Sequence, residues 1–289
     1  DYAFQTDSDT EVVLAAMQVW GRAALTEFNG MFAFAYWNQA RRELTLARDR
    51  MGIKPLYFAH ADNMVVFSSE VRSLLASDWI ERKHDPVGLA DYLRYQTVHA
   101  PRTIVKGVSL LPAGHWMRLQ GEETETGRWW NPAASATPSV RSRKEELARI
   151  HEALSRSVEL RLRSDVPLGA FLSGGIDSSA IVGLMKQATE QRISTFSVTF
   201  NEGEFDESPY SRLIAERFDT DHHEIRLTLD AFLEEVPAAL EAMDHPSGDG
   251  PNTYVVSKAT KAAGITVALS GLGGDELFAG YPVFQRTKA

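Results

Sequence analysis

The sequence predicts an α/β protein in two parts: a β-rich α+β domain, followed by a doubly wound parallel sheet. Up to about Trp130, short runs rich in β-branched and aromatic residues alternate with turn residues, which indicates a domain built largely of strands. From about residue 144, buried-type strands alternate with helical segments, as in a parallel sheet covered by helices. The small, polar, proline-bounded stretch between them predicts a linker over 131–143, separating domains at 1–130 and 144–289.

The elements of the first part follow from local pattern. Strands are expected over Met31–Trp37, Glu43–Arg48, Lys54–Phe58 and Met64–Ser68. Helices are expected over Thr10–Trp20, Val71–Leu75 and Pro86–Arg94. Asp9 precedes the first helix and is a candidate N-cap, because its carboxylate could accept a hydrogen bond from the first helical turn.

The second part opens with an amphipathic helix, since apolar residues recur there at spacings of three and four: Leu147, Ile150, Leu154, Val158 and Leu162. Four buried-type strands follow, over Leu168–Leu172, Ile193–Phe200, His223–Leu227 and Ile265–Leu269. Helical segments separate them. One of these is expected to begin with Ser208 as N-cap and Pro209 in the first helical position.

Composition places the chain among ordinary globular proteins of the cytoplasm. Its 289 residues are 44% hydrophobic and 24% charged, with a formal net charge of −9 that argues against a nucleic-acid-binding surface. No apolar run approaches the roughly 18 residues of a membrane helix, so no membrane partner is expected. The chain has no cysteine, which excludes disulfides, thiolate metal sites and a cysteine nucleophile within it.

The first Gly-rich loop, Ser173-Gly-Gly-Ile-Asp-Ser178, lies between a predicted strand and a predicted helix. The Gly-Gly pair lets the backbone approach a ligand closely, and the helix start favours a phosphate. Ser173 and Ser178 add hydroxyls, and Asp177 adds a carboxylate for Mg²⁺. The loop is not a Walker A motif, because the lysine is missing and the spacing is shorter. The alternative is an ordinary Gly-rich turn.

The second Gly-rich loop, Ser270–Tyr281, follows the last predicted strand. Ligands of doubly wound sheets bind beyond the carboxyl ends of the strands, so both loops can face one nucleotide. Taken alone, the second loop could also be a flexible strand-to-helix connection.

With these motifs, the chain resembles the glutamine-dependent asparagine synthetase family, and its first Gly-rich loop resembles the PP-loop of the ATP-pyrophosphatases. The resemblance covers nearly the whole chain. It rests on Phe4–Asp9, Gly30–Phe34, Arg48–Tyr57, Ser68–Glu70, Leu172–Ser178, Thr195–Phe200, Asp221–Glu224 and Ser270–Tyr281.

The resemblance implies a two-step reaction. An Ntn-type (class II) glutaminase domain would release ammonia from glutamine, and a synthetase domain would activate a carboxylate with ATP and Mg²⁺ as an acyl-adenylate for amide formation. The expected partners are therefore glutamine, ATP and aspartate or another carboxylate, and a homodimer is allowed.

The resemblance also implies roles for individual residues. Asp9 would hold the α-amino group of glutamine, and Asp177 and Asp275 would bind Mg²⁺. The adenosine site would be lined by Leu172, Val198, Ser270 and Gly271. The pyrophosphate would be held by Ser173, Gly174, Gly175 and Ser178.

Three features depart from the family pattern. The family nucleophile is an amino-terminal cysteine, which this chain lacks, and the chain stops soon after the second Gly-rich loop. We therefore expect a fragment that is inactive by itself, and the predicted function concerns the intact protein. Leu272 stands where well-studied asparagine synthetases carry an acidic residue tied to the acyl-adenylate.

Leu272 leaves two interpretations open, a tolerated variation or an acceptor carboxylate other than aspartate, as in lactam-forming relatives. A non-catalytic nucleotide-binding remnant is a third reading of the chain.

Two smaller features also have alternatives. His222 and His223 should point to opposite faces of a strand, which favours a structural or substrate-edge role over a shared metal. The turn-rich stretch 244–252 could border the acceptor pocket or form a surface loop.

Overall fold

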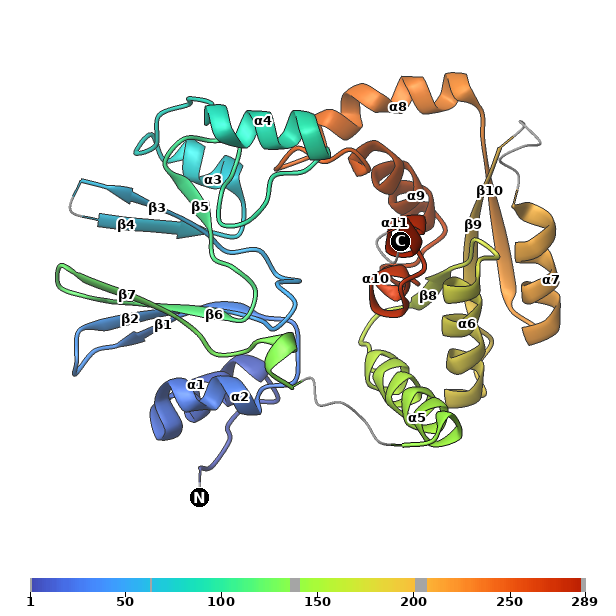
Figure 1. The fold of residues 1–289 in the computed structure, drawn as a ribbon, viewed down its shortest axis with the longest axis horizontal. Coiled ribbons are helices and arrows are strands. Elements are labelled where there is room, and N and C mark those ends of the chain that lie inside the picture. Colours follow the sequence, from blue (N-terminus) through green and yellow to red (C-terminus); the bar gives the residue numbers. More distant parts are fainter. Residues whose placement is uncertain (1, 63, 136–140, 201–206, 287–289) are drawn as a thin grey trace. The chain divides into compact units, whose positions relative to one another are not determined.

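The computed structural model describes residues 2–62, 64–135, 141–200 and 207–286, which form two compact units (Figure 1). The first unit comprises Asp1–Pro138 together with Met243–Gly248. The second comprises Ser139–Ala242 and Asp249–Ala289. Within the described residues, no helix is both long and apolar enough to cross a membrane.

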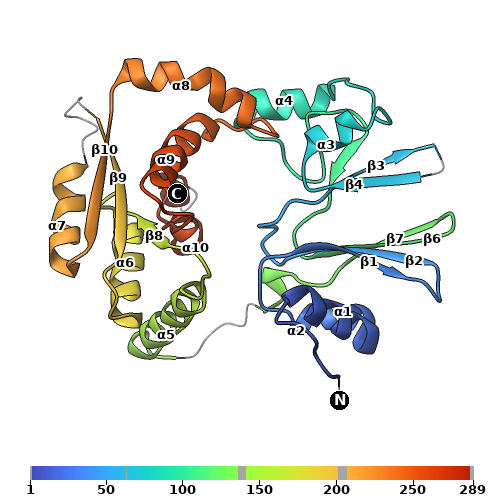
Figure 2. The same ribbon diagram turned by 180° about the vertical axis from the view of Figure 1, so that it is seen from behind.

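The first unit stacks two antiparallel sheets between helices (Figures 1 and 2). One sheet has the order β1-β2-β6-β7, with β1 at Ala33–Asn38, β2 at Glu43–Arg48, β6 at His115–Gln120 and β7 at Glu123–Arg128. The other has the order β4-β3-β5, with β3 at Tyr57–Ala61, β4 at Met64–Ser68 and β5 at Val108–Leu110. The helical elements of this unit are α1 (Asp9–Trp20), η1 (Gly21–Ala23), α2 (Ala24–Glu27), α3 (Val71–Ala76), α4 (Pro86–Tyr95) and η2 (Pro132–Ser135).

Alternating apolar side chains hold these layers together. One buried cluster joins strands of both sheets and contains Leu46, Leu56, Leu111 and Met117. A second packs α1 onto the four-stranded sheet through Ala16 and Met17. A third packs α3 onto the three-stranded sheet and includes Tyr57, Val71 and Leu74. The β-rich α+β character predicted for this part is confirmed.

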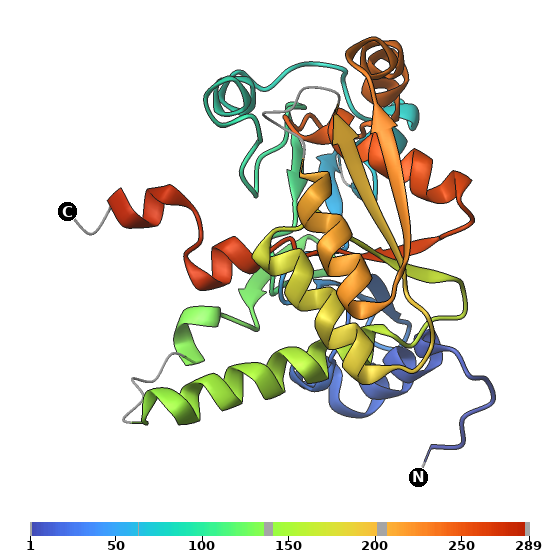
Figure 3. The ribbon, with the colours of Figure 1, turned by 90° about the vertical axis from the view of Figure 1, so that its right-hand side faces the viewer.

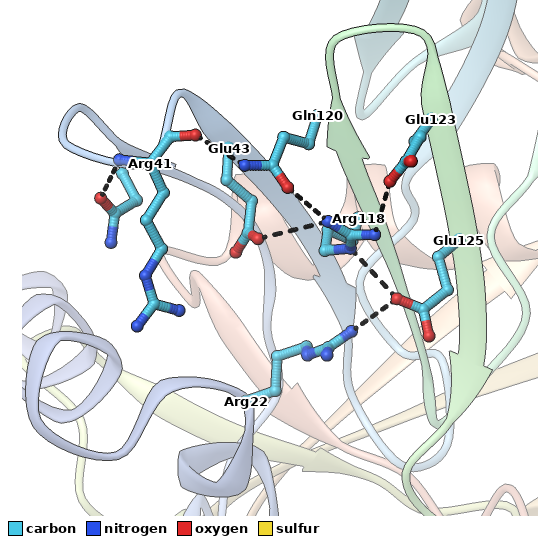
Figure 4. A network of polar contacts seen from close by, with 8 residues as sticks. Arg22, Arg41, Glu43, Arg118, Gln120, Glu123 and Glu125 are labelled. Carbon is cyan, nitrogen blue, oxygen red and sulfur yellow. Dashed lines mark hydrogen bonds and ion pairs between the residues drawn. The ribbon is translucent and has the colours of Figure 1, made fainter.

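A polar network holds β7, which brings few apolar side chains to the sheet (Figure 4). The Nε of Arg118 on β6 donates to Glu125 (3.1 Å), and the same guanidinium is paired with Glu123 at 3.4 Å and Glu43 at 3.7 Å. Arg22 donates to Glu125 (3.3 Å) and lies 3.9 Å from the centroid of the Trp116 ring. β7 is thus joined to β6 by antiparallel pairing, and charge pairing supplies side-chain contacts where the strand has little apolar surface to bury.

Two local expectations for the first unit were wrong. The N-cap of α1 is Ser8, whose Oγ accepts a hydrogen bond from Thr10 N (3.2 Å), and Asp9 is the first helical residue. The strand expected over Lys54–Phe58 begins only at Tyr57, because Lys54 N is bound to the Asp49 carboxylate (3.0 Å) in a turn.

The second unit is built on a four-stranded parallel sheet of order β10-β9-β8-β11. These strands are β8 (Leu168–Phe171), β9 (Ser194–Phe200), β10 (Asp221–Leu227) and β11 (Val267–Leu269), each within two residues of its predicted bounds. β9 and β10 lie on one side of β8, and β11 lies on the other side. The direction in which the chain adds strands therefore reverses between β8 and β11. This confirms the predicted doubly wound sheet and puts its switch point beside β8.

Helices cover both faces of this sheet. α6 and α7 lie side by side in front of β9 and β10 in Figure 3, and α9 lies on the opposite face in Figure 1. The helices of the unit are α5 (Arg143–Arg161), α6 (Ile176–Ala188), α7 (Ser208–Phe218), α8 (Leu229–Ala242), α9 (Gly250–Ala262), α10 (Gly274–Phe278) and α11 (Pro282–Arg286).

The ends of two helices show how sequence decides their bounds. α5 begins with a capping box in which Ser142 and Glu145 bind each other's backbone N–H. Leu154, Val158 and the C-cap residue Leu162 pack into the core as predicted, whereas Leu147 and Ile150 of the same predicted face are exposed. α7 begins at Ser208 with Glu207 in the cap position, so the cap expected at Ser208 was placed one residue late. Part of the predicted linker, 136–140, lies outside the described residues.

Candidate functional site

The first Gly-rich loop joins β8 to α6 and is held by its own serines. The hydroxyls of Ser173 and Ser178 lie 3.0 Å apart, and Gly175 N donates to Ser173 Oγ (3.3 Å). Gly175 occupies the N-cap of α6 and provides no side-chain cap, so the first N–H groups of α6 are not satisfied by a cap side chain. This arrangement suits an anion at the helix start.

Gly174 is required by its surroundings. Its φ of +82° is unfavourable for residues with a Cβ. A Cβ built there would lie 2.5 Å from Tyr210 Cβ and 2.8 Å from Ser211 N, both in the first turn of α7. The loop is therefore pressed against the start of a second helix, and only glycine fits between them.

The second Gly-rich loop follows β11 and meets the first loop directly. A Cβ on Gly271 would lie 2.7 Å from Ser178 N, and a Cβ on Gly274 would collide with the carboxylate of Asp177. The two loops thus approach each other at backbone distance beside the switch point of the sheet. A nucleotide bound there would touch both loops.

Carboxylates from both loops gather around Tyr281. The Tyr281 hydroxyl donates to Glu276 Oε1 (3.0 Å), and this bond, with partial desolvation and the charges of Glu276, Asp275 and Asp177, raises the pKa of Tyr281. No group of three or more His, Cys, Asp or Glu side chains that could hold a metal by itself occurs among the described residues. Asp177 and Asp275 are carboxylates of the kind that bind Mg²⁺ together with substrate phosphates and water.

The remaining candidate residues have different surroundings. Leu172 is buried in the core at 1% exposure, so it can line a ligand only with its main chain. Val198 is half-buried in β9. Ser270 Oγ accepts a hydrogen bond from Leu272 N (3.1 Å), and the Leu272 side chain is 86% exposed.

Ser179, in the first turn of α6, was missed by the sequence prediction. Its Oγ is buried and has no hydrogen-bond partner among the described residues. A buried hydroxyl of this kind is a polar group that a bound water or ligand could satisfy. The only signal in the sequence was that Ser179 directly follows Ser178, so that two hydroxyl side chains are adjacent.

The first unit contains a pocket of about 520 Å³ that includes Asp9. Asp9 and Thr10 line one side of it, and Lys54, Ser68 and Ser69 also contribute. No hydrogen bond to the Asp9 carboxylate occurs within the described part of the chain, since Ser8 caps the helix in its place. Lys54 adds a cation that the sequence prediction did not single out. The pocket is therefore lined by a carboxylate, from Asp9, and an ammonium group, from Lys54, which could pair with the two charged groups of an amino acid.

The turn beside this pocket is fixed by Asp49 and Arg48, which are both buried. The Asp49 carboxylate accepts hydrogen bonds from the backbone N–H groups of Phe32, Met51, Ile53 and Lys54, at 3.0–3.2 Å. The Arg48 guanidinium donates to the carbonyls of Gly52, Lys54 and Leu111, at 2.5–2.8 Å. Burial lowers the pKa of Arg48. Arg48 and Asp49 therefore hold the backbone of Lys54, a residue that lines the pocket.

The two histidines of β10 point to opposite faces, as expected. His222 Nδ1 lies 2.9 Å from Thr195 Oγ1, whereas the His223 ring stacks on Phe196 with centroids 5.0 Å apart. Burial is the main cause that lowers the pKa of His222. Both contacts are structural, and the pair forms no shared metal site among the described residues.

Comparison with known proteins gives the same division. A family model described as asparagine synthase matches residues 149–289, and one described as glutamine amidotransferase domain matches residues 1–130. The asparagine synthetase [glutamine-hydrolyzing] 1 of Bacillus subtilis is 35% identical over 98% of this chain and 45% of its own length. The amidase chyE of Penicillium rubens is 31% identical over 99% of this chain and 45% of its own length.

Among solved structures, the glutamine-dependent NAD+ synthetase of Acinetobacter baumannii is similar with a TM-score of 0.36 and 11% identity, covering 97% of this chain and 68% of that one. This similarity is too low to inform function. The fold and the two family matches define the class, an amidotransferase domain followed by a synthetase domain. The chain belongs to the glutamine-dependent asparagine synthetase family, and it spans about half the length of the curated relatives it matches.

Proposed function

We propose that the protein carrying this chain transfers the amide nitrogen of glutamine to a carboxylate at the expense of ATP, forming AMP and pyrophosphate. The observation that carries the proposal is the direct approach of the two Gly-rich loops at the switch point of the parallel sheet. A nucleotide placed there meets N–H groups, hydroxyls and two carboxylates. As part of the same proposal, the enzyme works in the cytoplasm, where ATP and glutamine are available.

The proposed roles follow from this geometry. The N–H groups and hydroxyls of the first Gly-rich loop hold the pyrophosphate, and the main chain at Leu172 and Gly271 borders the adenosine. Asp177 and Asp275 hold Mg²⁺, which would neutralise charge on the phosphate oxygens. The carboxylate acceptor attacks the α-phosphorus, pyrophosphate leaves, and ammonia then displaces AMP from the acyl carbon. The protein contributes mainly position and charge neutralisation.

In the first unit, the proposed ligand is glutamine. The free carboxylate of Asp9 would bind the α-amino group, in a pocket of about 520 Å³. Lys54 would contribute positive charge near the α-carboxylate. The chain contains no cysteine, so a nucleophile for glutamine hydrolysis by the family route has to come from outside these residues.

The acceptor is aspartate or another carboxylate, and one observation favours the second choice. Leu272 is 86% exposed on the second Gly-rich loop, and a leucine can neither accept a proton nor pair with a cation. The similarity to an amidase as well as to asparagine synthetases is consistent with either acceptor.

The test follows AMP formation from ATP by the complete protein, with glutamine or ammonium as nitrogen source and a panel of carboxylates. AMP that depends on aspartate, with asparagine formed in step, identifies an asparagine synthetase. AMP that depends on another carboxylate identifies an amidotransferase with a different acceptor. Nucleotide binding without AMP formation from any carboxylate would refute the proposal and indicate a non-catalytic binding protein.

A further inference from the structure

The four-stranded sheet of the first unit has a polar region on the face that α1 covers. Leu46 of β2 belongs to the apolar cluster on the opposite face. Because side chains alternate along a strand, Glu43 and Thr45 of β2 face α1. Their partners in β1 are Asn38 and Tyr36, which lie on the same face. Carboxylate, amide and hydroxyl groups therefore gather at this end of the covered face.

A cavity of about 350 Å³ lies between this polar region and the end of α1. Its walls are the last turn of α1 with η1, the ends of β1 and β2 that carry the polar region, and the turn between these strands. The volume is at the lower end of the range found for small-molecule sites. The cavity is therefore large enough for a ligand of a few heavy atoms.

Arg41 brings an unpaired positive charge to this cavity. Its backbone N donates to Asn38 Oδ1 (3.0 Å), and its carbonyl accepts from Gln120 Nε2 (2.8 Å), so its main chain is fixed. Its guanidinium makes no hydrogen bond or ion pair with any residue that the structure describes, and no dashed line reaches it in Figure 4. All the N–H donors of this guanidinium are thus available to a ligand.

Glu43 brings a carboxylate that the protein satisfies only in part. Its side chain is 18% exposed, and its ion pair with Arg118 is long, at 3.7 Å. Arg118 lies closer to Glu123 (3.4 Å) and Glu125 (3.1 Å). Within the described ranges, the Glu43 carboxylate accepts no hydrogen bond. Since carboxylates with so little exposure are normally hydrogen-bonded, Glu43 is ready to accept from a ligand.

The end of α1 favours a cation on the same side of the cavity. The C-terminal end of a helix carries partial negative charge, and α1 has no basic residue in its last turn. Arg22 lies beyond that turn and is directed to Glu125 (3.3 Å) and the Trp116 ring (3.9 Å from its centroid). Negative charge from Glu43 and from the helix end disfavours a phosphate in this cavity.

We propose that this cavity binds a free α-amino acid, with its carboxylate on Arg41 and its ammonium group between Glu43 and the end of α1. Tyr36, Asn38 and Gln18 line the cavity too and offer hydroxyl and amide groups to the ligand's side chain. The cavity shares no lining residue with the Asp9 pocket. Its ligand is therefore an effector rather than a substrate, and the proposal does not rest on the proposed function.

The test is calorimetric titration of the complete protein with each of the common L-amino acids in turn. We expect saturable binding that persists in Asp9→Asn, where the other pocket is altered. The same binding should weaken about tenfold or more in Arg41→Gln, because a charge-assisted hydrogen bond is lost. Arg42→Gln is the matched control, since it removes the same charge from the neighbouring residue, which does not line this cavity. It should bind as unmodified protein does.

Two derivatives of the amino acid that binds most tightly separate its two charged groups. N-acetylation removes the ammonium group, and amidation removes the carboxylate. Both derivatives should bind unmodified protein about tenfold more weakly or worse than the parent amino acid. In Arg41→Gln, the amide and the parent should bind about equally. This comparison on unmodified protein decides the proposal even if a variant fails to fold.

Four results would overturn the proposal. The first is the absence of saturable amino-acid binding. The second is binding that is lost in Asp9→Asn and kept in Arg41→Gln, which would assign the ligand to the Asp9 pocket. The third is an N-acetyl derivative that binds as tightly as its parent. The fourth is Arg41-dependent binding of inorganic phosphate that displaces the amino acid, because the site would then select anions rather than amino acids.

Discussion

The carboxylate of Asp49 shows how much one side chain can organise, since it accepts four backbone N–H groups while being 1% exposed. Asp49→Ala would leave those N–H groups buried without an acceptor. We expect the first unit to lose about 3 kcal/mol or more, given a cost of roughly 1–3 kcal/mol for each unsatisfied buried group.

All six tryptophans lie in the first unit, so their fluorescence during urea unfolding reports on that unit alone. Glu122→Gln, at an exposed position of the same unit, is the control and should leave the midpoint unchanged. A midpoint for Asp49→Ala equal to that of the control would mean that water or other groups satisfy these amides.

His245 gives a prediction about pH. Burial is the main cause that lowers its pKa from the ordinary value of 6.5, and its Nε2 must be unprotonated to accept from Ile104 N. The unfolded chain therefore binds the proton more readily than the folded one. The stability that depends on neutral His245 is complete above pH 6.5 and is lost as pH falls through the lowered value.

The measurement is tryptophan fluorescence during urea unfolding at pH 7.5, 6.5 and 5.5, for unmodified protein and His245→Gln. Glutamine keeps an acceptor but does not titrate. We expect its pH dependence to be flatter, by at most about 1.4 kcal/mol per pH unit for one proton. Parallel curves for the two proteins would show that His245 does not contribute.

At the scale of elements, the packing of the first Gly-rich loop against α7 makes a sharp comparison possible. Gly174→Ala should abolish ATP binding, because the new Cβ meets Tyr210 and Ser211 as well as an unfavourable φ of +82°. Gly264→Ala is the matched control, with φ +87° and open space around it, and should cost only the conformational strain of about 1–2 kcal/mol. Calorimetric titration with ATP distinguishes them. Equal affinities in both variants would show that contact with α7 does not position the loop.

Elements with strong apolar patterns were predictable, and elements held by distant polar groups were not. Of the four parallel strands, β8, β9 and β11 are rich in apolar and β-branched residues, whereas β10 was found although its sequence, Asp-His-His-Glu-Ile-Arg-Leu, is largely polar. β5, β6 and β7 were not predicted as strands. The residues of β7 are polar, and the strand is held by its antiparallel pairing with β6 and by the ion pairs of Arg118 (Figure 4). The start of β3 was placed too early because the Asp49 side chain binds the backbone N–H groups of Ile53 and Lys54 in a local turn, which strand propensity does not show.

The candidate site divides in the same way. The sequence predicted that both Gly-rich loops lie at strand ends, because parallel strands share one edge for their carboxyl ends. It could not show that Gly271 and Gly274 touch Asp177 and Ser178, which depends on the order of β8 and β11 in the sheet. The destination of Asp244 and His245 was also out of reach, since their partners lie more than 140 residues away.

For the whole molecule, we propose that a carboxylate is activated as an acyl-adenylate at the two Gly-rich loops. Direct evidence comes from the fate of the acceptor oxygen. The complete protein is given the acceptor with ¹⁸O in its carboxylate, ATP, Mg²⁺ and ammonium, and the phosphorus-containing products are analysed by mass spectrometry. We predict one ¹⁸O atom in AMP for each amide formed, because the carboxylate oxygen stays on the α-phosphorus when ammonia displaces AMP. Amide formation with ¹⁸O in inorganic phosphate, or with unlabelled AMP, would contradict the account.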